Sequence, residues 1–145
     1  MMNNDARTIV SANVHFRTTG QGKDGDSQVR DRITKGGQDF FQLFCCSSGN
    51  HGDDVWEPNT DNTRSMTAIT PLTVDELATC TFVAGLTATG DDTWSAIYTL
   101  QLTLSDGSTM SYSMGELWLY SHDGGLNEKD VILAKLTPIF PQPSS

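Results

Sequence analysis

The stretch Trp94–Leu104, which reads WSAIYTLQLTL, decides the fold class of this chain. Apolar and polar residues alternate along it, and a period of two places every second side chain on the same face of an extended strand. The apolar face carries Trp94, Ala96, Tyr98, Leu100, Leu102 and Leu104. This pattern predicts a β-strand that buries one face in a core.

A hairpin is predicted to follow directly. The segment Ser105–Ser108, which reads SDGS, contains an Asp-Gly pair that is typical of a tight turn between antiparallel strands. The return strand is expected to begin at Thr109. Gly115 predicts a bulge in it, before the apolar segment Leu117–Tyr120.

Six further segments are predicted strands, because β-branched, aromatic and other apolar residues recur between clusters of Gly, Asp and Asn. These segments are Ile9–Thr18, Ser27–Thr34, Asp39–Cys46, Arg64–Thr70, Thr79–Thr87 and Val131–Leu136. Thr73 and Glu76 have the spacing of a capping box and predict one helical turn. About eight strands in 145 residues predict one antiparallel β-sandwich over residues 1–137. The Pro- and Ser-rich residues 138–145 are expected to form a loosely ordered tail.

The charge of the chain excludes some classes of partner. Nine Lys and Arg residues stand against 18 Asp and Glu residues, which gives a formal net charge of -9. An acidic surface repels nucleic acid, and it repels anionic lipid unless a cation intervenes. The longest apolar runs fall short of the ~18 residues of a transmembrane helix. The first residues lack the pattern of a secretory leader, so the chain is expected to be intracellular or to have lost a leader.

The acidic residues are expected to gather at one end of the sandwich. If each strand spans the domain, successive connections alternate between the two ends. The first, third, fifth and seventh connections carry most of the acids, whereas the others carry only Asp75, Glu76 and Asp106. Crowded carboxylates repel one another, and Ca²⁺ removes that repulsion by accepting six to eight oxygen ligands. The predicted Ca²⁺ ligands are Asp24, Asp26, Asp54, Asp91 and Asp92. The alternative is a solvated rim in which Asp and Gly serve only as turn residues.

The order of these features resembles the PLAT/LH2 domains, which are C2-like β-sandwiches of lipoxygenases and lipases. The resemblance covers about two thirds of the chain and is carried by three stretches. These are Val14–Gly20 leading through Asp24-Gly25-Asp26 to Val29, then Arg64–Asp75, and then Gly90–Leu100 with Asp106-Gly107 and Trp118. The resemblance implies a non-catalytic module that binds a lipid surface or a protein, often with Ca²⁺ at the end that carries the loops.

Two other functions compete with this interpretation. A calcium-dependent, lectin-like carbohydrate site needs an aromatic platform beside polar side chains, and one loop supplies Trp56, Asn59, Asp61 and Asn62. The alternative for Trp56 is a plug folded over the end of the sandwich. A small enzyme or a transition-metal site is conceivable around His51 and His122, which lie near acidic residues. Trp94 and Trp118 are interpreted as core or rim aromatics.

The three cysteines allow few disulfides. Cys45 and Cys46 are neighbours, so we expect no bond between them and at most one disulfide to Cys80, with buried free thiols favoured.

Taken together, the sequence predicts a calcium-assisted binding module for a lipid surface, a glycan or a protein, as a monomer or a homodimer.

Overall fold

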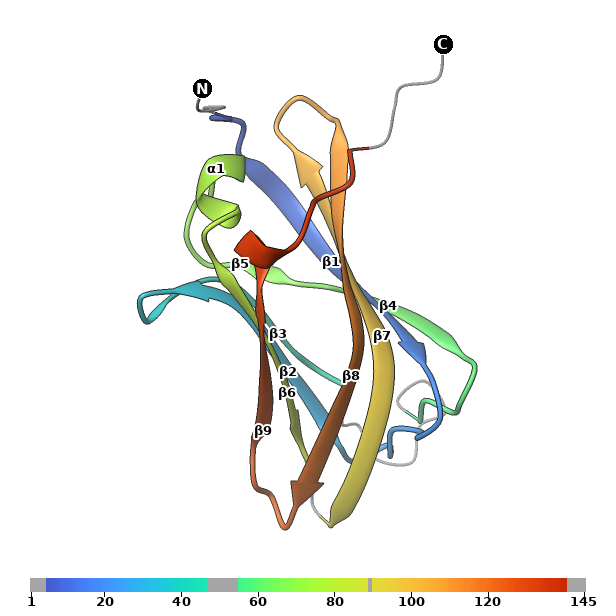
Figure 1. Ribbon diagram of the computed structural model, residues 1–145. Helices are drawn as coiled ribbons and strands as arrows, with labels where there is room; N and C mark the ends of the chain where they lie inside the picture. Colours follow the sequence, from blue (N-terminus) through green and yellow to red (C-terminus); the bar gives the residue numbers. More distant parts are fainter. Residues whose placement is uncertain (1–4, 47–54, 89, 141–145) are drawn as a thin grey trace.

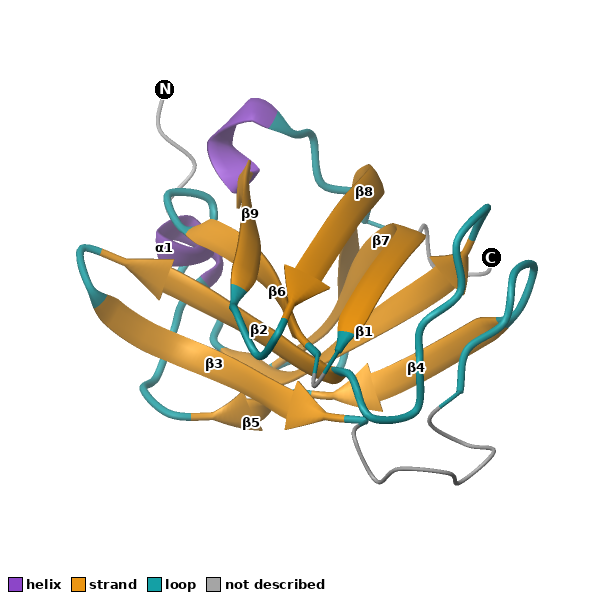
Figure 2. Ribbon diagram, turned by 90° about the horizontal axis from the view of Figure 1, so that it is seen from below, coloured by secondary structure: helices purple, strands orange, loops and turns teal. Residues whose placement is uncertain are grey.

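The computed structural model describes residues 5–46, 55–88 and 90–140, which fold into two β-sheets packed face to face (Figures 1 and 2). The first sheet has the strand order β4-β1-β7-β8, and the second has the order β5-β3-β2-β6-β9. The elements are β1 (Ile9–Thr18), β2 (Gln28–Lys35), β3 (Gln38–Cys45), β4 (Asp61–Ser65), β5 (Thr67–Ala68), α1 (Val74–Leu77), β6 (Thr81–Thr87), β7 (Asp91–Leu104), β8 (Thr109–His122) and β9 (Asn127–Ile132). All paired strands are antiparallel, which confirms the predicted β-sandwich.

The core lies between the two sheets and is built from alternate residues of the strands. The predicted inward face of β7, from Trp94 to Leu104, is buried throughout, with no more than 2% of any of its side chains exposed. Val14 and Phe16 of β1 and Ile33 of β2 are fully buried beside it. Burial of apolar surface is the dominant favourable contribution to folding, so this alternation determines which face of each strand turns inward.

The predicted hairpin is confirmed, including its bulge. β7 and β8 pair from Thr103↔Thr109 down to Asp91↔His122. The register shifts opposite Tyr98 and Thr99, where Gly115 adopts a φ of +78°. A side chain at that position would be strained, which explains why the bulge falls on a glycine.

Two predicted strands differ most from the observed ones in their bounds. The segment Arg64–Thr70 is not one strand, because β4 belongs to the first sheet and β5 to the second, with the buried Met66 between them. The last strand runs over Asn127–Ile132 and is followed by a short 3₁₀ turn, rather than over Val131–Leu136. β9 is largely polar and lies at a sheet edge, so it lacks the alternation that reveals the buried strands. Ile139, in the expected tail, exchanges two backbone hydrogen bonds with Ser111.

The helical content is small. The capping box at Thr73 and Glu76 is present, as predicted, and it begins the four-residue helix α1. In the part of the chain that the structure describes, the helices are far shorter than the ~20 residues that span a bilayer.

One ionisable group lies inside the core. Asp31 of β2 is fully buried, and its Oδ1 accepts a hydrogen bond of 3.2 Å from the backbone of Gly85. Among the described residues, no donor reaches its Oδ2, and the hydroxyl of the buried Tyr98 also lacks a partner. Burial raises the pKa of Asp31 well above its ordinary value of 3.8. The protonated, neutral carboxyl is therefore the form that the core favours.

We predict that Asp31 makes the protein less stable as pH rises. The folded state holds a proton that the unfolded state releases above pH ~4, so the free energy of unfolding falls by roughly 1.4 kcal/mol per pH unit until the raised pKa is passed. Urea unfolding of Asp31→Asn, which is neutral at every pH, is expected to lack this slope. A wild-type slope that is retained in the variant would contradict the assignment to Asp31.

Candidate functional site: the acidic end of the sandwich

Acidic residues from separate segments meet where β7 begins and β8 ends, at the lower end of Figure 1. We call this region the acidic end and define it by Asp24, Asp26, Asp91, Asp92 and Asp123. The carboxylate of Asp92 accepts hydrogen bonds from the backbone N–H of Asp24 (3.1 Å) and the hydroxyl of Ser27 (2.6 Å). These bonds fasten the β1–β2 connection to the start of β7, so Asp24 and Asp92 come together as predicted.

Burial and neighbouring negative charges disfavour the ionised form of Asp24. The pKa of Asp24 lies above its ordinary value, first because of partial burial and then because of the negative charges of Asp92 and Asp26. Asp26 also lines a hollow of about 460 Å³ together with Asp123 and Arg30. A carboxylate whose ionisation is opposed by neighbouring negative charges, as that of Asp24 is, attracts a cation.

The predicted calcium ligands nevertheless divide into two groups. Asp91 and Asp92 are consecutive residues of β7, and consecutive residues of a strand face opposite sides of the sheet. Asp92 is therefore buried beside Asp24, whereas Asp91 is exposed on the outer face and pairs with His122. The strand predicted to begin at Trp94 in fact begins at Asp91, so Asp91 and Asp92 lie in β7 and not in the connection before it. Asp54 lies outside the described residues.

The exposed group consists of Asp91, His122 and Asp123, whose ligand atoms lie close together. His122 Nδ1 contacts Asp91, and His122 Nε2 lies 3.1 Å from a carboxylate oxygen of Asp123. The ligand atoms of these three residues all lie within 4.8 Å of one another, which is true of no other such trio of His, Cys, Asp and Glu in the described part of the chain. An imidazole with two carboxylates suits a transition metal better than Ca²⁺, which prefers oxygen. His51, the other histidine of the enzyme hypothesis, is not among the described residues.

Trp56 is a core residue and not a surface platform. Only 1% of it is exposed, and its ring packs 5.1 Å from that of Phe16 and 5.3 Å from that of Trp94. The cations of Lys23 and Arg64 lie over the same ring, at 4.9 and 5.3 Å from its centroid. The expectation that Trp56 offers a stacking face to a sugar is thus wrong, and the plug interpretation is correct.

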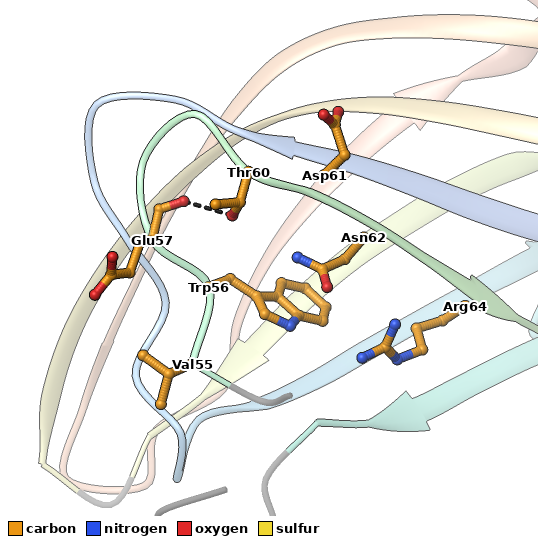
Figure 3. Close-up of a pocket in the computed structure, with 7 residues that line it drawn as sticks. All are labelled: Val55, Trp56, Glu57, Thr60, Asp61, Asn62 and Arg64. Carbon is orange, nitrogen blue, oxygen red and sulfur yellow. Dashed lines mark hydrogen bonds between the residues drawn. The ribbon is translucent and has the colours of Figure 1, made fainter. Parts of the chain in front are cut away.

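The loop around Trp56 does form a hollow, shown in Figure 3. Its volume is about 700 Å³, and the lining includes Asp61 and Asn62 of the predicted ligand set. Asp61 is already engaged, because it forms an ion pair with Arg17 and lies 3.1 Å from His15. Asn59 serves in the turn, where it adopts a φ of +66° and donates its backbone N–H to Thr18.

Lys23 was missed by the sequence analysis. It is 99% buried, and its ammonium donates hydrogen bonds to the carbonyls of Asp24 (2.8 Å), Ser27 (2.9 Å) and Cys46 (2.6 Å). The bonds join the β1–β2 connection to the end of β3. A single lysine in a Gly- and Asp-rich loop is typical of a solvated residue, so the sequence gives no indication that Lys23 is buried and bonded to backbone carbonyls.

The prediction that Cys45 and Cys46 are not bonded to each other was wrong. Cys45 and Cys46 form a disulfide between adjacent residues. In an extended strand their side chains would point to opposite faces, but Cys46 adopts a left-handed φ of +75°, which takes it out of the strand. Cys80 is a free, buried thiol, as favoured, and burial raises its pKa to about 11.

The other two tryptophans differ sharply in exposure. Trp94 is completely buried, in agreement with a core role, and its Nε1 donates to the hydroxyl of Thr18. Trp118 is 49% exposed on the outer face of β8, and Tyr120, two residues later, is 51% exposed. The alternation along this segment is enough to place both side chains on the outward face of β8, so their exposure could have been predicted from the sequence.

Comparison with known proteins does not assign the chain to a family. No family model matches the chain, and no curated protein matches it. The resemblance to PLAT/LH2 domains therefore stays a prediction.

We predict that Lys23 holds the acidic end together. Lys23→Met keeps the apolar stem but leaves three carbonyls, two of them in buried bonds, without their charged donor, so the free energy of unfolding is expected to fall by about 2–4 kcal/mol. The melting temperature should fall by roughly 5–15 °C. Lys129→Met, a matched change at an exposed position of β9, should stay within about 0.5 kcal/mol of wild type. Equal melting curves for the two variants would contradict this role.

Proposed function

We propose that this chain is a non-catalytic binding module whose acidic end binds Ca²⁺ and presents it to a ligand. The observation that carries the proposal is the hydrogen bond from the backbone N–H of Asp24 to the carboxylate of Asp92, which brings the two residues together. The pKa of Asp24 is raised first by partial burial and then by the negative charges of Asp92 and Asp26. These carboxylates come from two segments of the chain that are far apart in sequence. A divalent cation would offset their repulsion, and Asp side chains with backbone carbonyls are the oxygen donors that Ca²⁺ prefers.

The arrangement of the loops supports this role. Asp92 fixes the position of Asp24 through its backbone, and Lys23 anchors the same connection from inside. The loop is thus held before any ion arrives, so little ordering is needed on binding. At the opposite end of the molecule, by contrast, the carboxylate of Asp106 is paired with Arg7.

The Trp56 hollow is not proposed as a carbohydrate site. Its aromatic ring is buried under two cations, and Asp61 is held by an arginine. The choice among a lipid surface, a glycan and a protein therefore depends on other surfaces of the molecule.

We predict that Ca²⁺ binds to the chelator-treated protein with a Kd on the order of 10⁻⁴–10⁻³ M, the range of exposed modular sites. At a hundredfold excess over Kd, the ion should stabilise the fold by about 2.7 kcal/mol. Asp24→Asn is expected to weaken binding about tenfold or more in calorimetry, because it removes one ligand charge. Asp75→Asn, at the α1 end of the molecule, should bind like wild type.

Two results would contradict the proposed calcium site. Melting curves that coincide in Ca²⁺ and in chelator, together with no heat of binding, would remove the calcium proposal. Equal losses in Asp24→Asn and Asp75→Asn would place the ion elsewhere.

A further inference from the structure

Two large aromatic side chains stand side by side on the outer face of the first sheet. Trp118 and Tyr120 are two residues apart on β8, which places them on the same face at a separation of roughly 7 Å. About half of each residue is exposed. Their cross-strand neighbours on β7 are Ser95 and Thr93, and Ile97, opposite Glu116, extends the apolar surface. We call Trp118 and Tyr120 the aromatic strip.

The indole of the aromatic strip is fixed in place although it faces solvent. Its Nε1 donates a hydrogen bond of 3.1 Å to the carboxylate of Glu116. Hydrogen bonds from Thr19 and from Trp118 lower the pKa of Glu116, so this acceptor stays ionised at neutral pH. A surface indole with its polar edge already paired presents its apolar faces as a pre-ordered platform.

The charges around the strip disfavour an anionic occupant. Glu116 stands at one end, and Asp91 and Asp123 stand beyond the other, next to His122. These carboxylates repel phosphate backbones and anionic headgroups. Arg17 lies on the row of Ile97 and Glu116, two strands in from β8, but its charge is already paired with that of Asp61.

We infer that the aromatic strip, Trp118 and Tyr120, binds a neutral polysaccharide. The apolar faces of pyranose rings would stack on the two aromatic rings, and sugar hydroxyls would donate to the carboxylate of Glu116. Sugar rings alternate apolar faces with hydroxyl edges, which matches a strip of aromatic faces with charged hydrogen-bonding groups along its borders. The inference concerns a surface outside the proposed calcium ligands and does not require the ion.

Affinity electrophoresis tests this inference on the full chain. Native gels containing soluble mixed-linkage β-glucan, xylan, galactomannan or dextran are run with Ca²⁺ and with chelator. We expect at least one polymer to retard the wild-type protein in both conditions. Trp118→Ala and Tyr120→Ala should each weaken the apparent affinity about tenfold or more, a factor that corresponds to ~1.4 kcal/mol of lost stacking.

Two controls separate binding from folding. Phe44→Ala removes an equally exposed aromatic side chain from β3 in the other sheet and should be retarded like wild type. Trp118→Phe keeps a stacking face but loses the bond to Glu116, so an intermediate affinity is expected. Melting temperatures close to wild type in all variants would show that the fold is intact.

The inference would be overturned by any of three results. The first is that none of the four polymers retards the wild-type protein. The second is that Trp118→Ala and Phe44→Ala migrate alike in every gel. The third is that the strip instead mediates retention by a poly-lysine gel, or a dimer in sedimentation that Trp118→Ala abolishes. Because the gels are read with and without Ca²⁺, a failure here is distinct from a failure of the calcium proposal.

Discussion

The contact among Phe16, Trp56, Trp94 and Tyr98 is the constraint on which the rest of the structure depends. Phe16 and Tyr98 meet edge to face with their ring centroids 4.9 Å apart, and Trp94 packs against Phe16, Trp56 and Tyr98 at 5.3–5.7 Å. Aromatic pairs of this kind contribute about 0.5–1.5 kcal/mol beyond the area they bury. The cluster ties two neighbouring strands to the loop that contains Trp56. It thereby fixes the end of the sandwich at which Asp92, two residues before Trp94, is held.

The fold was predictable because the buried strands obey one simple rule. The period of two along β7 specifies which side chains are inward, and every one of them is buried. The Asp-Gly turn and the glycine bulge then fix the return strand. The same rule fails where a strand is short or polar. β5 has two residues and β9 carries mostly charged and polar side chains, so neither leaves an alternating pattern.

The acidic end was predictable only in part. Counting connections placed Asp24 and Asp92 at one end correctly, and their hydrogen bond shows that they meet. The division between Asp91 and Asp92 was missed because β7 was expected to start three residues too late. Lys23 and the Cys45–Cys46 bond depend on tertiary packing and on a left-handed backbone, which residue type and spacing do not reveal. A buried lysine is rare enough that composition argues against it.

The strands β7 and β8 contribute to the core with one face and carry the candidate binding surface on the other. Inward residues of β7 and β8 such as Tyr98 and Tyr112 are buried, so truncating one would cost about 3–5 kcal/mol of stability by opening a cavity. Outward residues of the same strands contribute little to that packing, since substitutions at exposed positions usually change stability by about 0.5 kcal/mol or less. Exposed aromatic side chains such as Trp118 and Tyr120 are therefore not explained by folding. Their position on a rigid hairpin, rather than on a loop, is what a precise contact surface requires, because the bulge, the pairing and the core beneath them fix where each ring can lie.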